Sequence, residues 1–166
     1  MEDIEGEIYI LGDDINTDDI VPSFTLTMRD PNEIAKHVLE FIDPNFIQKV
    51  TKRTIIVGGY NFGTGSSREE AVNVFKILGI KVIIAKSFSR IYFRNLINNG
   101  IVAIKCDWDE ATFTVGDQVQ ISIENGTIFN KSKSIDIKYR KLPQFLKEIL
   151  ESEGILNQLK IKLKSH

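Results

Sequence analysis

Short apolar runs alternate with amphipathic stretches through the middle of the chain. Residues 53–58, 81–85 and 101–104 are almost continuously apolar, which predicts buried strands. The stretches between them carry apolar positions every three or four residues and predict helices over 66–78 and 90–98. Because buried strands that alternate with helices favour parallel strands covered by helices, we expect an α/β fold.

The N-terminal part has a weaker pattern. Residues 6–11 alternate between apolar and polar positions and predict a strand, and a polar loop follows over 12–19. Residues 22–31 are irregular. A helix is predicted from its N-cap, Asp30, to Pro44, because Asp is a good capping residue and Pro ends a helix.

The C-terminal part changes character. Residues 115–138 alternate and contain Asn125-Gly126, which is a strong hairpin signal, so we expect an antiparallel β section there. A last helix is predicted to start at Pro143. The basic stretch 160–164 is typical of a solvated chain end.

Length and charge narrow the function classes. The 166 residues fit a single domain, 1–166, with a substantial core. The formal net charge of −2 gives no electrostatic case for binding nucleic acid or a membrane surface. No apolar run is long enough to span a bilayer, and the acidic N-terminus lacks the features of a signal peptide. We therefore expect a cytoplasmic protein.

Cysteine and histidine are scarce. Cys106 is the single cysteine, and an iron–sulfur cluster needs about three or four thiolates. The two histidines, His37 and His166, are far apart in the sequence. The sequence therefore predicts no metal site and no cofactor within this chain.

The most informative stretch is 63–69, where a predicted strand turns into a predicted helix. It contains two glycines, two serines, an arginine and a glutamate. A helix start suits an anion, and Arg68 can take a carboxylate through two parallel hydrogen bonds. Ser66 and Ser67 each begin a capping-box pattern, so an ordinary helix start is the alternative. The glycines favour close approach of a small acidic ligand.

Three blocks make the chain similar to a known family. They are residues 12–22 (GDDINTDDIVP), residues 61–69 (NFGTGSSRE), and the segment that runs from IAKSFSRI at 84–91 through Arg94 and Asn95 to Gly100. The segment 142–156 also resembles that family's C-terminal helix and its glycine-containing end. The chain resembles the small subunit of isopropylmalate isomerase and homoaconitase, which corresponds to the swivelling domain of aconitases.

The resemblance implies a fold, a reaction and a partner. The fold would be a three-layer β/β/α swivelling domain with mixed sheets. The reaction would be that of a hydro-lyase, which removes water from a malate-type acid and adds it back the other way round. The family's four-iron–four-sulfur cluster is carried by a large subunit, so this chain is expected to act only with that partner. 2-Isopropylmalate, in leucine biosynthesis, is the expected substrate.

The resemblance also assigns roles to residues. Ser66 matches the catalytic base, and Ser67 and Arg68 match residues that bind substrate carboxylates. Asp18 matches an acid at the edge of the active site, where we give it an orienting role among the catalytic residues. Thr17, which precedes it, is counted with the substrate-binding residues.

The chain departs from the family pattern in the loop that reads the variable end of the substrate. Relatives often carry Arg-Tyr after a small residue there, whereas this chain has Phe24, Leu26, Met28 and Arg29. The three apolar side chains suit an isopropyl group. Arg29 suits a distal carboxylate instead, or is simply solvated next to a helix start.

Several alternatives follow from that departure. The chain could serve a homoaconitase, a citraconate (methylmalate) hydratase or a dimethylmalate dehydratase. A non-catalytic carboxylate-binding module and a purely structural partner of an iron–sulfur protein are the alternatives outside the enzyme class. Association of small subunits with one another is also open.

Overall fold

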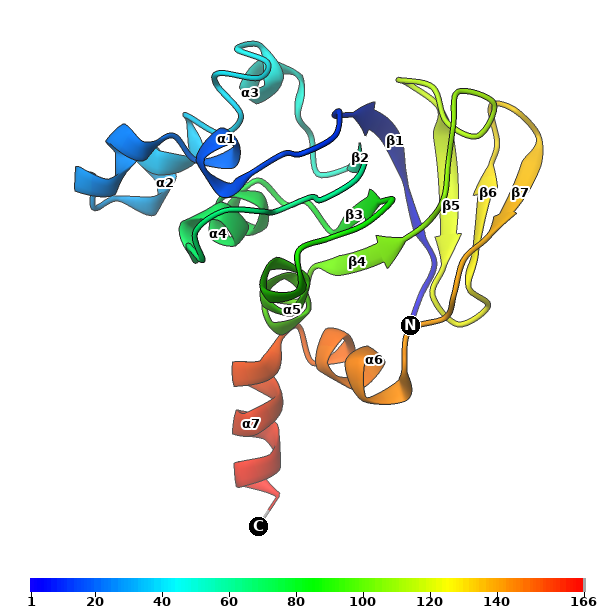
Figure 1. Cartoon of the computed structure of the whole chain (residues 1–166). Coiled ribbons are helices and arrows are strands. Elements are labelled where there is room, and N and C mark those ends of the chain that lie inside the picture. Colours follow the sequence, from blue (N-terminus) through cyan, green and yellow to red (C-terminus); the bar gives the residue numbers. More distant parts are fainter. Residues whose placement is uncertain (166) are drawn as a thin grey trace.

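The computed structural model describes residues 1–165, and within them seven strands form one mixed sheet (Figure 1). The strands are β1 (Ile4–Ile10), β2 (Thr54–Gly58), β3 (Val82–Ala85), β4 (Val102–Lys105), β5 (Gln118–Ser122), β6 (Thr127–Asn130) and β7 (Ile135–Lys138). Their order across the sheet is β4-β3-β2-β1-β5-β6-β7. The three apolar runs of the middle part are therefore neighbouring strands, as predicted.

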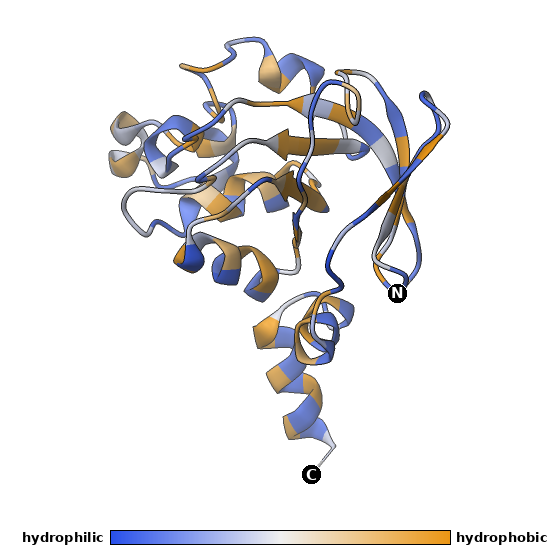
Figure 2. Ribbon diagram, turned by 45° about the vertical axis from the view of Figure 1, so that its right-hand side comes forward, coloured by the Kyte–Doolittle hydropathy of each residue, from blue (hydrophilic) through white to orange (hydrophobic). Residues whose placement is uncertain are grey.

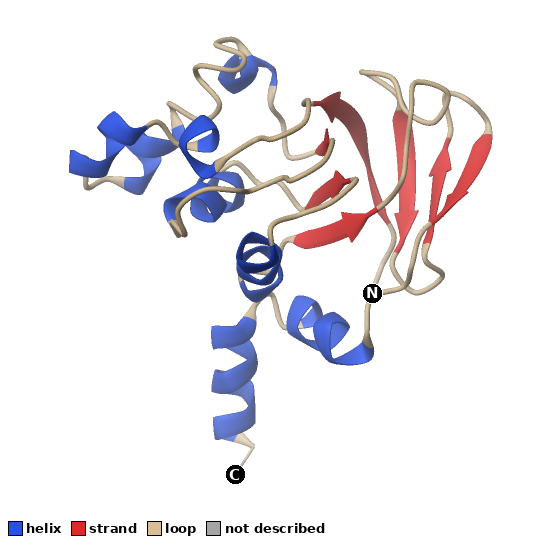
Figure 3. Cartoon of the chain, in the orientation of Figure 1, coloured by secondary structure: helices blue, strands red, loops and turns tan. Residues whose placement is uncertain are grey.

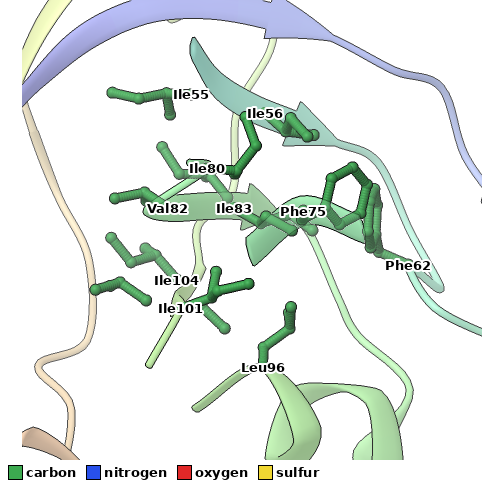
Figure 4. Packing of buried hydrophobic residues seen from close by; sticks show 14 of the residues in the cluster. Ile55, Ile56, Phe62, Phe75, Ile80, Val82, Ile83, Leu96, Ile101 and Ile104 are labelled. Atoms are coloured by element: carbon green, nitrogen blue, oxygen red, sulfur yellow. The ribbon is translucent and has the colours of Figure 1, made fainter. Parts of the chain in front are cut away.

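The half of the sheet from β1 to β4 is parallel. Ile8 lies opposite Ile55, and Ile56 lies opposite Ile83. Every residue of β2 and β3 is buried, which is why these strands are apolar without alternation. Figure 2 shows the hydrophobic positions concentrated in these strands. Figure 4 shows their side chains packed in one cluster with Leu96 of the following helix.

The other half, from β1 through β5 and β6 to β7, is antiparallel. Gly126 takes a φ of +65° in the turn between β5 and β6, so the predicted Asn-Gly hairpin is confirmed. Figure 3 shows that the helices gather around the parallel half, while the antiparallel strands form a separate flank. The α/β class with a mixed sheet is confirmed, and its two β parts are halves of one curled sheet.

Eight helical segments connect and cover the strands within the described residues. They are α1 (Thr17–Ile20), the 3-10 helix η1 (Ser23–Thr27), α2 (Pro31–Ala35), α3 (Phe46–Lys49), α4 (Glu70–Ile77), α5 (Arg90–Asn98), α6 (Gln144–Glu151) and α7 (Ile155–Lys164). Part of α7 is the basic stretch 160–164, whose side chains are exposed as expected. Figure 1 shows α7 projecting away from the sheet.

The helix predicted from Asp30 to Pro44 is much shorter than expected. Asp30 caps it by accepting a hydrogen bond from the Asn32 N–H, but α2 ends at Ala35. Leu39 takes a φ of +54° and donates its N–H to the Ile20 carbonyl, so tertiary contacts replace the helical hydrogen bonds. The prediction of a helix reaching Pro44 was wrong.

No helix among residues 1–165 combines the length and the apolar character needed to cross a membrane.

Candidate substrate-binding site

The site forms where the loop after β1 meets the loop after β2. The Thr17 N–H donates to the Thr64 carbonyl at 2.8 Å, and the Thr17 hydroxyl donates to the Ser66 carbonyl at 2.8 Å. The Gly63 N–H donates to the Ile15 carbonyl at 2.7 Å. β1 and β2 are parallel neighbours, so their carboxyl ends bring the first two sequence blocks together. Ligands of open α/β sheets bind at such an edge.

Arg68 joins these two loops through one of its nitrogens. Its Nη1 donates to Asp18 Oδ1 at 3.0 Å and to the Val21 carbonyl at 2.9 Å. The Arg68 side chain is only 9% exposed, whereas that of Asp18 is 64% exposed. The structure therefore pairs an acid of the first block with the arginine of the second block, a contact that sequence reasoning did not predict.

The other two nitrogens of Arg68 are unusual. Nε and Nη2 are buried, and neither has a hydrogen-bond partner among residues 1–165. An unpartnered buried N–H group costs free energy, so such groups in a folded protein call for an explanation. Nε and Nη2 form one edge of the guanidinium, and that edge matches the two oxygens of a carboxylate. The described residues therefore leave this donor pair of Arg68 without a partner.

The two serines lie in a loop and not at the start of a helix. α4 begins at Glu70, and its N-cap, Glu69, makes no side-chain capping bond. The prediction that the helix starts at Ser66 or Ser67 through a capping box was therefore wrong. Gly65 takes a φ of +96°, and the Thr17 hydroxyl engages the Ser66 carbonyl, so this part of the chain is held in a loop. Both serine side chains are exposed.

Helix α5 supplies a further wall of the site that sequence reasoning did not nominate. A hollow of about 40 Å³ is lined by Thr17, Gly63, Gly65, Ser66, Ser67, Arg68, Ser89, Ile91, Tyr92 and Asn95. The last four come from α5 and its N-cap. The third sequence block already contained them, but no charge or glycine pattern distinguished them from ordinary helix residues.

The hollow is small because the parts behind it are tightly packed. A Cβ on Gly63 would come within 2.2 Å of the Tyr92 ring, so only glycine fits there. The Tyr92 hydroxyl donates to the Ala71 carbonyl at 2.7 Å, and burial raises the pKa of Tyr92 well above its ordinary value. The neutral Tyr92 side chain therefore packs between the loop that contains Gly63 and helix α4, and holds that loop against α5. The remaining volume holds about one water molecule, so the hollow alone does not enclose a ligand of the size of a malate-type acid.

The predicted specificity residues do not line this hollow. Phe24 and Leu26 of η1 are 48% and 63% exposed. The Phe24 ring packs edge-on against the His37 ring, with centroids 4.9 Å apart. Met28 and Arg29 line a different hollow, which they share with Glu69 and residues of α2 and α4. The structure therefore separates the predicted substrate-binding residues into two groups.

This chain offers no ligand set for a metal cluster within residues 1–165. No group of three or more His, Cys, Asp or Glu side chains is arranged to hold a metal ion there. Cys106 is buried, and burial together with the neighbouring Asp107 raises the pKa of its thiol to about 11. His166 lies outside the described residues. The residues described do not fit an iron–sulfur cluster.

A family model described as the aconitase C-terminal domain matches residues 16–108. That span is more than half of the chain and contains all three sequence blocks except the start of the first. The chain belongs to the aconitase C-terminal domain family.

Members of this family with similar sequences match almost the whole chain. A protein of Nautilia profundicola named 3-isopropylmalate dehydratase small subunit is 42% identical over 167 residues, covering 100% of this chain and 99% of its own length. A Thermotoga maritima protein named 3-isopropylmalate dehydratase small subunit 1 is 44% identical, covering 95% of both chains.

A solved family structure has the same fold. It is the crystal structure of 3-isopropylmalate dehydratase from Methanocaldococcus jannaschii, and it superposes with a TM-score of 0.91 at 41% identity. The alignment covers 99% of this chain and 100% of the other. The family resemblance drawn from the three sequence blocks is confirmed over the full length.

Proposed function

We propose that this chain is the small subunit of a two-chain hydro-lyase that converts 2-isopropylmalate to 3-isopropylmalate in leucine biosynthesis. The names of relatives that are 41–44% identical over nearly the whole chain support this proposal. The observation that carries it is the free Nε and Nη2 edge of Arg68, which is buried beside Ser66 and Ser67 in the family's most specific block. An acid substrate supplies the carboxylate that this edge lacks.

Ser66 is the proposed catalytic base. The ionised Ser66 oxygen takes the proton from the carbon next to a substrate carboxylate, and the electron pair of that C–H bond forms the double bond. The C–O bond of the neighbouring carbon breaks, and the departing hydroxide takes up a proton from solvent and leaves as water. Rehydration returns the proton and places the hydroxyl on the other carbon. Since α4 begins only at Glu70, the cation of Arg68, rather than a helix start, is the group that stabilises the Ser66 alkoxide.

Substrate carboxylates are bound by Arg68 and Ser67 in this proposal. Asp18 and Thr17 orient the site. Asp18 holds Nη1 of Arg68, which fixes the plane of the guanidinium, and Thr17 holds the Ser66 carbonyl. These two contacts leave the donor edge of Arg68 and the Ser66 hydroxyl free to face the substrate.

The exposed apolar side chains of η1 are proposed to meet the isopropyl group. Within residues 1–165, the side chains of Phe24 and Leu26 are largely exposed. Met28 and Arg29 follow directly after η1 in the sequence. Exchanging residues 24–29 for the loop of a homoaconitase small subunit should shift the preference toward a substrate with a distal carboxylate. Unchanged preference would show that η1 does not read this end of the substrate.

The large subunit is proposed to carry the four-iron–four-sulfur cluster, which supplies a Lewis acid for the leaving hydroxyl. The hollow beside Ser66 has room for about one water, so the partner is also proposed to enclose the rest of the substrate. We place the assembled enzyme in the cytoplasm.

The test is anaerobic co-expression with the cluster-bearing large subunit from the same genome. Hydration is then measured on isopropylmaleate, homoaconitate, aconitate and citraconate. Activity on isopropylmaleate that neither chain shows alone supports the proposal. Activity on homoaconitate or citraconate instead would show that the chain is the small subunit of a homoaconitase or a citraconate hydratase. Stable association without turnover on any acid would indicate a carboxylate-binding or structural partner instead.

A further inference from the structure

A hollow much larger than the one beside Ser66 lies on the other face of α5. This groove has a volume of about 780 Å³ and runs between α5, α6, the end of β4 and the segment 140–143 that leads into α6. Figure 1 shows α5 and α6 side by side below β4. The floor is apolar and is built by Phe88, Phe93, Leu142, Leu146 and Ile149. Phe145, also part of its lining, is 64% exposed.

The rim of the groove is strongly basic. Five cationic residues line it, and no aspartate or glutamate does: Arg90, Arg94, Lys105, Arg140 and Lys141. All five are exposed, and none takes part in a salt bridge within residues 1–165. The whole chain carries a formal net charge of −2, so this concentration of positive charge is local. Like charges gathered in one place repel one another and attract an acidic occupant.

The groove adjoins the candidate site through the first turn of α5. Ser87, Phe88 and Arg90 line the groove, whereas Ser89 and Ile91 line the hollow beside Ser66. A surface that closes over Ser66 therefore reaches the mouth of the groove without crossing any other element. Ile91, on the side of the hollow, is 57% exposed and adds apolar surface beside Arg90 of the groove.

We propose that the groove docks an acidic segment with apolar side chains that belongs to the large subunit. This inference rests on the proposed function, because it needs the two-chain enzyme. Aromatic and arginine side chains are the residues enriched in protein interfaces, and both are concentrated here. Phe145 and Phe93 receive the apolar side chains of the segment. Arg94 and Arg140 pair its carboxylates, which steers the two chains together and fixes their register.

The experiment compares two double charge reversals in the full chain. Arg94→Glu/Arg140→Glu changes the rim, and Lys52→Glu/Lys138→Glu makes the same charge change at exposed positions away from it. Thermal melts first establish that both variants fold like the wild type. The dissociation constant for the anaerobically purified large subunit is then measured at several salt concentrations, together with kcat at saturating small subunit.

The rim variant should bind about tenfold more weakly or worse and lose most of the salt dependence, since the docking charges have the wrong sign. Its kcat at saturation should match the wild type, because the groove touches no reacting atom. The control variant should bind like the wild type. Equal binding by the rim variant overturns the groove proposal and leaves the proposed function intact. If the wild-type chain itself fails to bind the large subunit, both proposals fall.

Discussion

Arg68→Met tests whether the buried arginine is kept for a ligand or for the stability of the fold. Methionine fills a similar volume without polar groups. The substitution removes two buried, unpartnered N–H groups, each of which costs about 1–3 kcal/mol in the isolated chain. It also removes a hydrogen bond from a charged group to the Val21 carbonyl, which contributes about 1.5–3 kcal/mol.

The ion pair with Asp18 adds little to this comparison. Asp18 is 64% exposed, so solvent screens the pair, and its contribution is about 0–1 kcal/mol. The opposing terms nearly cancel. The isolated Arg68→Met chain should therefore unfold with a free energy equal to that of the wild type or higher by up to about 2 kcal/mol. Each kcal/mol corresponds to about 2–4 °C in Tm for a chain of this size.

Urea denaturation of the isolated chain gives the stability, and the assembled enzyme gives the activity. Activity should fall although stability does not. The kcat/KM of the assembled enzyme should be roughly a hundredfold lower, because the substitution removes a buried donor pair for a carboxylate. Arg53→Met is the matched control, since Arg53 makes one long contact of 3.5 Å to Gln118 on the surface. It should change neither quantity. If the Arg68→Met chain loses about 2 kcal/mol or more of stability, Arg68 is a structural residue and is not kept for a ligand.

Three further predictions concern the packing around the site and the titrating groups. Gly63→Ala should destabilise the chain by roughly 2–4 kcal/mol in urea denaturation, because the φ of Gly63 is +84° and an added Cβ would overlap the Tyr92 ring. A loss of less than about 0.5 kcal/mol would contradict this packing. Cys106, with a pKa of about 11, should react with a thiol reagent at pH 8 only after unfolding, and rapid labelling of the folded chain would show that the thiol is accessible. Burial alone would raise the pKa of Asp117, but hydrogen bonds led by that of Asn130 outweigh it and lower the pKa. The stability from Asp117 is therefore full above about pH 4, where the unfolded carboxyl is ionised, and is lost as the pH falls through the folded pKa. Acid unfolding of Asp117→Asn should show a flatter pH dependence below about pH 4, and an unchanged slope would exclude this contribution.

The strands of the parallel half were predictable because strands that are buried on both faces consist almost entirely of apolar residues. β2 and β3 are apolar at nearly every position, and each follows a polar or glycine-containing segment. Helix boundaries were less predictable. Ser66 and Ser67 satisfy the capping-box pattern locally, but the Thr17 hydroxyl and the glycines hold them in a loop. Contacts from a distant block decided the outcome, and a local pattern does not contain them.

The N-terminal helices show the same limit. α1 has four residues and a complete capping box around Asn16, yet it is too short for a periodic pattern. α2 stops at Ala35 because Leu39 turns back to bond Ile20, which is a tertiary contact. Short helices in this part of the chain are fixed by what they pack against, not by their own sequence.

The central residues of the candidate site were predictable as neighbours, and those at its edges were not. The glycines and the arginine of the second block predicted an anion site at Ser66, Ser67 and Arg68, and these three residues line one hollow. Their binding of an anion stays a prediction. The wall from α5 was not identified, since Ser89 and Asn95 resemble ordinary helix residues until the sheet places α5 against the loop. The free edge of Arg68 depends on the burial of its side chain, so only the folded chain shows it.

The shared active site is tested most directly by titrating this chain into a fixed amount of the large subunit, with dehydration of 2-isopropylmalate as the readout. We expect the rate to rise until the two chains are equimolar. Ser66→Ala should assemble equally well but give almost no turnover, while Ser152→Ala, at the end of α6, should behave like the wild type. Full turnover with Ser66→Ala would exclude Ser66 as the catalytic base.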